Sequence, residues 1–485
     1  MNTEVISYLL SKVCIGMAIA MIAPLLMSVF YGESCFEDYI LAIGLTLIIS
    51  SVFNWYGRNA DCKNISVREG IGTVFFSWLI AAGIAAFPFT MMGLLDPASA
   101  YFETMSGLTT TGATAMRDLE ILPKSILFWR SVTHWIGGIG IIVLFVALLP
   151  QIAGSAVYLF NAEVTGFSTS RILPRIRNTA VALFYIYLLI TIFLTGILVA
   201  LGMSNYDAVN HAFSTIATGG FSTYNSSVAH FNSAAIEYTI AIFMILAGGN
   251  FALYYHITQN GFKVLWNDLE FKIYIGIFII LTALITANIV YYNGFSVLDG
   301  IRVAFFQVAS FGSTTGYVSC DYDKWPAFSK LLLAVMYFTG GCAGSTAGGI
   351  KVCRFIVLLK TVAAELRRTL HPQMLLNVYY GERRLPMPTV INISRFFFMY
   401  IMIIAVISLI VSSTGLGVEE SIFGVAACLS SVGPGFDSIG ATGNYAHVTP
   451  IGKLALSLAM LLGRLELFTA LALLRSDYWK TSKRW

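Results

Sequence analysis

The stretch SFGSTTGY, at residues 310–317, is polar and contains two glycines, yet it lies between long apolar runs of the chain. In lipid, irregular backbone would leave N–H and C=O groups without hydrogen-bond partners, at a cost of several kcal/mol each. Such backbone is tolerated at membrane depth only where protein buries it or where it lines a water-filled path. The stretch therefore predicts a buried or pore-lining loop, provided that its surroundings span a membrane.

The composition indicates a membrane protein. Of the 485 residues, 57% are hydrophobic and only 11% are charged, whereas a soluble domain has about 25% charged residues. The first apolar run carries Lys12, lacks a clear cleavage site and is too long for a secretory signal, so we expect a retained helix. Apolar runs of about 18 to 25 residues can cross a bilayer. We expect spans near residues 5–30, 37–56, 71–93, 126–150, 179–202, 236–258, 271–293, 328–350, 391–413 and 452–475.

The charge distribution predicts the orientation of the chain. If both termini lie in the cytoplasm, the predicted cytoplasmic segments hold most of the 29 Lys and Arg residues, as the positive-inside rule requires. Topology explains these basic groups, so we do not infer nucleic-acid binding from them. About half of the acidic residues then lie outside, where they would raise the local cation concentration within about a Debye length.

A fourfold repeat organises the chain. Four times, an apolar span is followed by a short half-apolar segment, a glycine-containing polar turn and a second apolar span. The other three turns are LTTTGATA (108–115), STIATGGFST (214–223) and LSSVGPGFDS (429–438). When Gly112, Gly219, Gly316 and Gly433 are aligned, an apolar residue stands ten positions upstream in every repeat, namely Phe102, Val209, Phe306 and Phe423. This shared offset gives the predicted register and favours Gly433 over Gly435.

The short segments predict re-entrant helices. They begin with acidic residues or proline, which suit a helix start, and their length of about 12 to 17 residues is too short to span a bilayer. We therefore predict an all-α polytopic membrane protein. It has two extra N-terminal helices followed by four helix–pore-loop–helix repeats, with boundaries at 1–70, 71–150, 151–260, 261–360 and 361–485.

Four such loops around one axis predict a ring of carbonyl oxygens that can replace the water shell of a cation. Glycine allows the necessary turn because it adopts positive φ without steric cost, and threonine hydroxyls add oxygen ligands. A single turn of this kind is more typical of an ordinary periplasmic loop, but four in register favour a selectivity filter. The candidate ion-binding residues are Thr110, Thr111, Gly112, Ala217, Thr218, Gly219, Thr314, Thr315, Gly316, Ser431, Val432 and Gly433.

This fourfold pattern, with TTGY at 314–317, resembles the Trk/Ktr/HKT superfamily of potassium transporters over residues 71–475. The two additional N-terminal spans are similar to those of the bacterial Trk potassium-uptake membrane subunit. The resemblance implies a protein like four fused subunits of a simple potassium channel, located in the bacterial inner membrane. The four aligned glycines would line the filter, and K⁺ would be the transported ion.

The filter departs from that of tetrameric potassium channels, because none of its four loops is TVGYG. In the predicted register, Ala113, Gly220 and Pro434 stand where the third repeat has Tyr317. We therefore expect a less regular filter and some sodium leakage. In plant relatives a serine in the first column goes with sodium transport, so Gly112 favours potassium.

The segment MYFTGGCAGSTAGGIKVCRF, at residues 336–355, predicts a broken span. Each interior glycine costs a helix about 1 kcal/mol relative to alanine, although small residues also serve close helix packing in membranes. GGxxGSTxGGIK is the second match to the superfamily, in which this segment is a mobile loop that obstructs the pore below the filter. The implied gate residues are Gly340, Gly341, Gly344, Ser345, Thr346, Gly348 and Gly349.

Two charges are assigned to the pore. Arg464 lies within the last apolar span, where a charge costs about 2.5 to 3.5 kcal/mol, so it should face water or a partner; the alternative is that it snorkels to the interface. The resemblance implies that Arg464 points into the pore beneath the filter and that Lys351 lies at the cytoplasmic exit with Arg354. His134, in the matching span of the first repeat, is interpreted as a packing residue and not as a proton relay.

The sequence contains no P-loop or Rossmann glycine pattern, since GGIGI at 137–141 lies inside a span. We therefore expect no intrinsic organic cofactor, and any nucleotide control must come from another chain. The resemblance implies a homodimer with a peripheral cytoplasmic nucleotide-binding regulatory subunit.

The leading hypothesis is gated, channel-like potassium uptake. The alternative is a Na⁺- or H⁺-coupled potassium symporter, which usually needs an ionisable group at the membrane midplane; only Arg464, Glu103 and Glu237 qualify. We do not expect an enzyme, because the sequence has no HExxH, no GxGD and no paired carboxylates within a span.

Overall fold

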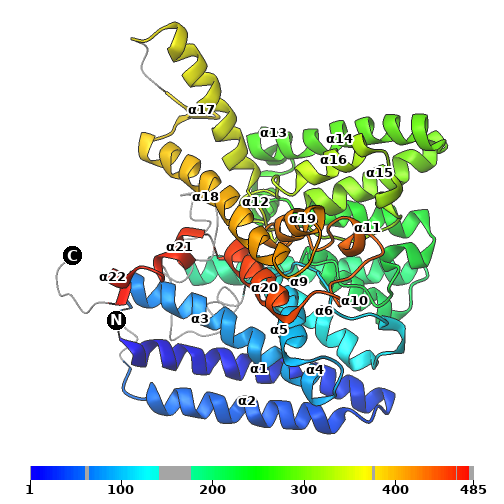
Figure 1. Ribbon diagram of the computed structural model, residues 1–485, viewed down its shortest axis with the longest axis vertical. Helices are drawn as coiled ribbons and strands as arrows, with labels where there is room; N and C mark the ends of the chain where they lie inside the picture. Colours follow the sequence, from blue (N-terminus) through cyan, green and yellow to red (C-terminus); the bar gives the residue numbers. More distant parts are fainter. Residues whose placement is uncertain (1, 61–64, 141–175, 374–376, 466, 480–485) are drawn as a thin grey trace.

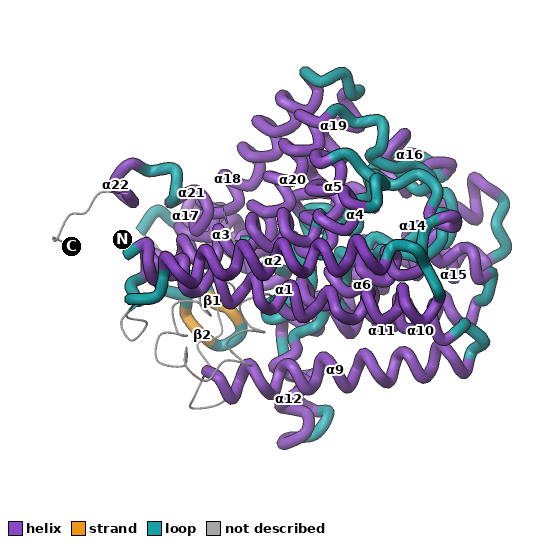
Figure 2. The backbone as a smooth tube through the Cα atoms, turned by 90° about the horizontal axis from the view of Figure 1, so that it is seen from below, coloured by secondary structure: helices purple, strands orange, loops and turns teal. Residues whose placement is uncertain are grey.

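The protein is described by a computed structural model that covers residues 2–60, 65–140, 176–373, 377–465 and 467–479. These residues are mostly helical, and the strands among them are β1 (Tyr379–Tyr380) and β2 (Arg383–Arg384), which form one short antiparallel hairpin (Figure 2). The all-α fold class predicted from the sequence is therefore confirmed.

The chain opens with two long helices, α1 (Thr3–Tyr31) and α2 (Phe36–Tyr56), that pack against each other. Gly32 ends α1 in the left-handed conformation, at φ 66°, where glycine carries no steric penalty. The third helix, α3 (Val67–Ala85), starts with a capping box between Ser66 and Glu69 and is followed by α4 (Phe87–Met91). Figure 1 shows α1 lying beside both α2 and α3.

After this pair the order long helix, short helix, loop, returning helix occurs four times. The long helices are α3, α9 (Ile176–Ala200), α14 (Leu269–Asn293) and α18 (Met387–Ser412). The short helices are α5 (Pro97–Leu108), α10 (Asn205–Ile216), α15 (Val297–Gly312) and α19 (Val418–Leu429). Side-chain caps explain several of the starts: Asp96 accepts from the backbone of Ala98 and Ser99, and Ser204 from Asp207.

The returning helices are shorter than the sequence predicted. They are α6 (Lys124–Ile139), α11 (Ala234–Ala247), α16 (Ala327–Met336) and α20 (Pro450–Arg464). The break expected after α16 is present, because residues 337–351 are not helical. The prediction of one continuous span at 236–258 is wrong: α11 and α12 (Phe251–Asn260) are bent by 94° about residues 248–250. Residues 141–150 of the predicted span 126–150 lie outside the described residues.

The remaining helices connect and extend the repeats. Between the second and third repeats lies α13 (Lys263–Asn267), and α17 (Val352–Leu370) projects from the body at the top of Figure 1. The chain continues after α20 with α21 (Leu467–Ala472) and α22 (Ser476–Trp479). Single 3₁₀ turns cover Leu119–Ile121, Ser227–Phe231, Tyr322–Lys324 and Asp437–Ile439.

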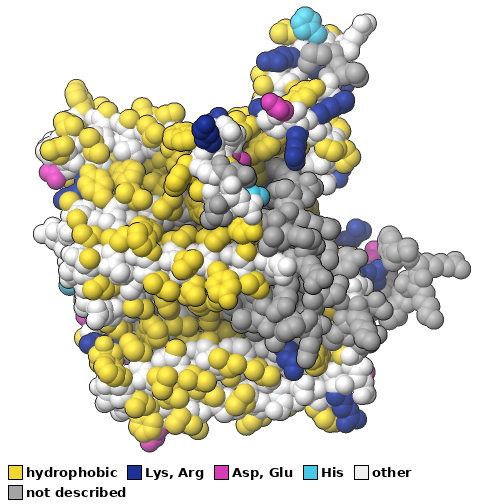
Figure 3. Space-filling view, turned by 180° about the vertical axis from the view of Figure 1, so that it is seen from behind, with side chains coloured by type: hydrophobic (Ala, Val, Ile, Leu, Met, Phe, Trp, Pro, Cys, Tyr) yellow, Lys and Arg dark blue, Asp and Glu magenta, His cyan; other side chains and the backbone are white. Residues whose placement is uncertain are grey.

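The outer surface suits a lipid environment. Six of the described helices are long and apolar enough to cross a membrane, or seven if α11 and α12 count as one span. Leu26, Ile48 and Phe193 are each more than 60% exposed, and Figure 3 shows hydrophobic side chains spread widely over the visible body. An apolar surface of this extent marks contact with a membrane.

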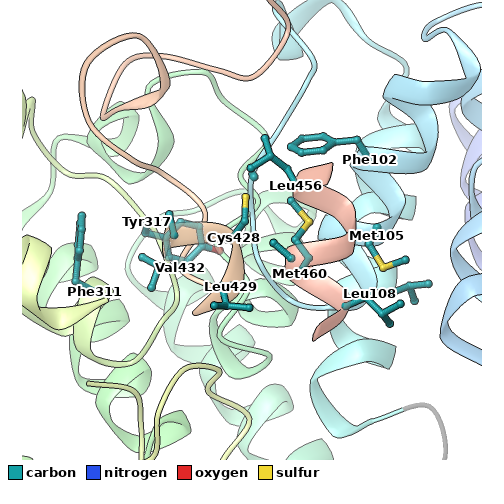
Figure 4. Close-up of a cluster of buried hydrophobic side chains, with 14 of the residues drawn as sticks. Phe102, Met105, Leu108, Phe311, Tyr317, Cys428, Leu429, Val432, Leu456 and Met460 are labelled. Atoms are coloured by element: carbon teal, nitrogen blue, oxygen red, sulfur yellow. The ribbon is translucent and has the colours of Figure 1, made fainter. Parts of the chain in front are cut away.

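One part of the buried interior lies where the first and last repeats meet. In Figure 4, Leu456 and Met460 of α20 lie between residues of α5, such as Phe102 and Met105, and Leu429 of α19. All five side chains are buried. Because α20 contacts both α5 and α19, the last repeat packs against the first, and the four repeats can close around a common centre.

Candidate functional site

The four loops that follow the short helices share one backbone conformation. A hydroxyl residue with a left-handed φ of 54–58° opens each loop, and two positions later a glycine has a φ of 81–93°. The hydroxyl residues are Thr110, Thr218, Thr314 and Ser431, and the glycines are Gly112, Gly220, Gly316 and Gly433. A left-handed non-glycine residue costs roughly 1–2 kcal/mol. Four such residues at equivalent positions therefore indicate that each loop is held in place by its surroundings.

The residue between each pair is bonded to its own short helix in the same way in all four repeats. The backbone N–H of Thr111 donates to the Ser106 carbonyl at 2.9 Å, and that of Gly219 to Ser214 at 2.8 Å. The corresponding bonds from Thr315 to Ser310 and from Val432 to Ala427 are 2.8 and 2.9 Å long. The loops are thus superposable in conformation and in hydrogen bonding.

The loops touch one another in cyclic order. A Cβ atom placed on Gly112 would collide with the carbonyl oxygen of Gly219, and one on Gly220 with that of Thr315. A Cβ on Gly316 would meet the Val432 oxygen, and one on Gly433 would meet the Thr111 oxygen, which closes the circle. The four glycines and the four preceding carbonyls therefore form one ring in which only glycine fits.

The predicted register of the second repeat is wrong by one residue. Gly220 has the positive φ and the cyclic contact, whereas Gly219 takes the place of Thr111. Ala217 aligns with Thr109 at the end of the short helix and not with the first loop residue. The residues equivalent to Tyr317 are then Ala113, Phe221 and Pro434.

The physical reason for the extra glycine lies in another repeat. A Cβ on Gly219 would collide with the ring of His134, which is fully buried, stacks on Phe221 with ring centres 4.0 Å apart and lies 3.2 Å from the Ser214 hydroxyl. His134 packs as the sequence interpretation expected. The apolar position ten residues upstream misled the alignment, because Asn210 stands there once Gly220 is used.

A vestibule of about 290 Å³ lies on one side of the ring and is lined by Gly112, Gly220 and Gly316. Polar side chains, including Asn225 and Asn444, complete its wall. The neighbouring loops are tied by Asp323, which accepts hydrogen bonds from the backbone of Asp437 at 3.3 Å and of Ala441 at 3.1 Å. Burial is the main cause that raises the pKa of the Asp323 carboxyl above its ordinary value.

The non-helical segment 337–351 lies on the other side of the ring. Its base is paired like a hairpin, by a 2.8 Å bond from Gly340 N–H to the Ile350 carbonyl and a 3.2 Å bond from Val352 N–H to the Gly341 carbonyl. Two of its residues, Gly348 and Thr346, reach the hydroxyl residues of the ring. The N–H of Gly348 donates to Thr314 Oγ1 at 2.8 Å, and the Thr346 hydroxyl lies 3.4 Å from that of Thr218.

Arg464 also contacts both this segment and the ring. One guanidinium nitrogen donates to the Thr346 carbonyl at 3.0 Å and lies 3.5 Å from Thr110 Oγ1. The other donates to the carbonyl of Gly138 at 3.2 Å and to that of Gly137. Arg464 therefore faces the space beneath the ring, which contradicts the snorkelling alternative. Lys351 is buried and donates to the Ala347 carbonyl, so it stabilises the segment from within and does not line an exit.

Sequence analysis missed a buried ion pair beside the ring. Arg130 Nε lies 2.8 Å from Glu103 Oε1, both side chains are almost fully buried, and the guanidinium also donates to the Ser222 carbonyl at 3.2 Å. Glu103 in turn accepts from the N–H of Ala115 at 2.8 Å. The pair therefore links the loops of the first two repeats. The one signal available in the sequence was a charge on each of two adjacent apolar helices.

Comparisons with known proteins identify the family of the chain. Residues 38–481 match the TrkH family model, described as cation transport protein. The chain is 37% identical to the Trk system potassium uptake protein TrkH of Salmonella typhimurium, covering 95% of this chain and 96% of that protein. It is 32% identical to TrkH of Halomonas elongata, covering 99% and 100%.

A solved structure is similar over the whole chain. The crystal structure of the potassium transporter TrkH from Vibrio parahaemolyticus superposes with a TM-score of 0.90 at 33% identity, covering 99% of this chain and all of that one. The superfamily suggested by the filter and glycine-rich segments is therefore confirmed. The chain belongs to the TrkH family of cation transport proteins.

Proposed function

We propose that the chain is the membrane subunit of a potassium-uptake system and conducts K⁺ through the ring of four loops. The observation that carries the proposal is the cyclic packing of Gly112, Gly220, Gly316 and Gly433 on four equivalent carbonyl groups. Rings of backbone carbonyls can replace the hydration shell of K⁺. The relatives named above are potassium uptake proteins or a potassium transporter, which supports K⁺ as the transported ion.

The hydroxyl residues of the ring would form the innermost cation site. The segment 337–351, which we name the gate loop, contacts these residues through Gly348, whose N–H donates to Thr314 at 2.8 Å. A second donor, Arg464 at the end of α20, lies 3.5 Å from the hydroxyl of Thr110. Hydrogen-bond donors that occupy the oxygen atoms a cation would use, one of them carried by a positive charge, oppose the passage of the cation. We infer that the arrangement is closed and that conduction requires the gate loop to move.

Selectivity should be weaker than in a filter of four identical loops. Tyr317 braces the ring, since its hydroxyl donates to the carbonyl groups of His211 at 3.2 Å and Phe221 at 3.3 Å. The equivalent residues Ala113, Phe221 and Pro434 have no hydroxyl and cannot make such a bond. We therefore expect some sodium to pass.

A symporter is less well supported than a channel-like pore. Glu103 is paired with Arg130 at 2.8 Å and Glu237 with Arg302 at 3.5 Å. Both carboxylates named as coupling candidates thus already face a cationic side chain, which disfavours them as binding sites for a coupling ion. We also propose no enzymatic activity for this chain.

The partners we propose are a second copy of the chain and a peripheral nucleotide-binding regulator, with both termini in the cytoplasm of a bacterial inner membrane. The projecting helix α17 supports a partner, because Leu359, Val362, Leu366 and Leu370 form an apolar stripe that is 57–77% exposed. Since α17 follows the gate loop directly, a force on α17 would reach the gate loop.

The test is influx of rubidium at low external potassium, in a bacterium that lacks its own potassium uptake. Wild type should restore influx, and Gly316→Ser should lower potassium over sodium discrimination, because a Cβ there strikes the Val432 carbonyl. Gly294→Ser is the matched control, since Gly294 also has positive φ but open space around it. Failure to restore influx by correctly inserted protein, even with a cytoplasmic partner supplied, would exclude the proposal.

A further inference from the structure

The base of the gate loop is held by one buried carboxylate on a different element. Glu270 lies in the first turn of α14 and is 6% exposed. Its Oε1 accepts the backbone N–H of Ala343, inside the gate loop, at 2.9 Å, and that of Cys353, just beyond the loop, at 3.0 Å. A single oxygen atom therefore ties both arms of the gate loop to a membrane-spanning helix.

We infer that Glu270 is a positioning residue that keeps the gate loop closed against the filter; this inference rests on the proposed function. The tie holds Ala343 and Cys353. The contacts with Thr314 and Arg464 are made by other residues of the gate loop, Gly348 and Thr346.

Glu270 is not needed to start its own helix. Asp268 caps α14 by accepting the N–H of Phe271 at 2.8 Å. An acidic residue in the first turn also favours the helix through the helix dipole, but this effect depends only on charge. Variants that separate charge from hydrogen-bond acceptance therefore separate the structural role from the positioning role.

The test measures rubidium influx into liposomes that contain the purified protein without any regulator. Glu270→Met keeps the length of the side chain and removes both hydrogen bonds, so influx should rise about tenfold. Glu270→Gln keeps an oxygen that can accept both N–H groups, so its influx should stay close to wild type. Glu270→Asp keeps the charge and the helix start but not the reach, so its influx should lie between the two.

Two controls separate this inference from the proposed function. Deleting residues 343–347 should raise influx by itself, and Glu270→Met should add nothing in that background because the two changes act on one element. Glu237→Met removes an equally buried carboxylate, 5% exposed, that pairs with Arg302 away from the gate loop, and should not raise influx.

The outcomes are distinct. If the deletion raises influx but Glu270→Met and Glu270→Asp do not, the inference is overturned and the gate remains. If Glu270→Asp equals wild type while Glu270→Gln opens the pore, charge and not hydrogen bonding is decisive, and the inference is also overturned. If the deletion itself fails to raise influx in folded protein, the gate is excluded, and the role of Glu270 is excluded with it.

Discussion

The four loops of the ring and the four returning helices come from the same repeats but differ in how well they keep the symmetry. The loops repeat the same left-handed residue, the same positive-φ glycine and the same hydrogen bond. The returning helices end differently: α6 at Ile139, α11 in a 94° bend, α16 before the long gate loop, and α20 at Arg464. Symmetry is kept where four segments present equivalent atoms to one ring, and is lost directly below it.

The geometry of an axis explains this difference. Four segments can surround an axis equally, but only one segment can lie on it. A segment that lies on the axis beneath the ring must therefore come from one repeat, and the residue that it contacts there comes from another. The contact between the third-repeat residue Thr346 and the fourth-repeat residue Arg464, at 3.0 Å, has this asymmetry.

The largest effect is expected at the symmetric ring. Gly220→Ala should reduce influx by roughly a hundredfold, because positive φ costs a non-glycine residue about 1–2 kcal/mol and its Cβ would also strike the Thr315 carbonyl. The measurement is rubidium influx normalised to protein in the membrane. Gly219→Ala should also reduce influx, but only through the His134 ring.

The double variant Gly219→Ala with His134→Ala sharpens this test. It removes the ring that a Cβ on Gly219 would meet, so influx should recover, whereas His134→Ala should not rescue Gly220→Ala. Rescue of both variants would contradict the register of the second repeat described above.

The second-largest effect on influx is expected in the asymmetric region beneath the ring. Arg464→Met should raise influx about tenfold, because it removes the donor groups that hold the Thr346 carbonyl and approach Thr110. Arg130→Met is the matched control: it removes a buried arginine beside the ring but not beneath it, and should lower stability through the unpaired Glu103 without raising influx. Equal influx in Arg464→Met and wild type would show that Arg464 does not keep the gate loop closed.

This contrast also explains what could be predicted from the sequence. Spans, short helices and the broken third repeat follow from local patterns: apolar length, acidic or proline starts, and five glycines within ten residues. The register of the second repeat did not follow, because it depends on His134, a side chain from another repeat. The bend at 248–250 was missed because two glycines and Asn250 are a weaker signal than the segment after α16.

Contacts between residues that are distant in the sequence could not be predicted from local patterns, for the same reason. Glu103 and Arg130 lie on separate helices, as do Glu270 and the gate loop it holds. A charge in an apolar helix predicts that a partner exists, but the identity of the partner depends on how the repeats pack. The resemblance to the superfamily predicted the location of Arg464 but neither of these two contacts.

The smallest effect is expected where the two regions meet. Thr314→Val removes the acceptor of the Gly348 N–H but keeps the shape of the side chain, and one neutral hydrogen bond contributes about 1 kcal/mol. Without a regulator, chemical labelling of a cysteine introduced at Ser345, which reports opening of the gate loop, should therefore become about fivefold faster. Thr315→Val is the matched control, because the hydroxyl of Thr315 bonds to that of Ser313 at 2.7 Å and not to the gate loop.

A dependence on potassium makes the same test sharper. If a cation and the gate loop use the same oxygen of Thr314, each must weaken the binding of the other to the same extent. Raising potassium should then speed chemical labelling of a cysteine introduced at Ser345, in the tip of the gate loop, and this acceleration should be smaller in Thr314→Val. Labelling that ignores potassium in the wild-type background would show that the filter and the gate loop respond independently, and the boundary between the symmetric and asymmetric regions would then also separate two uncoupled functions.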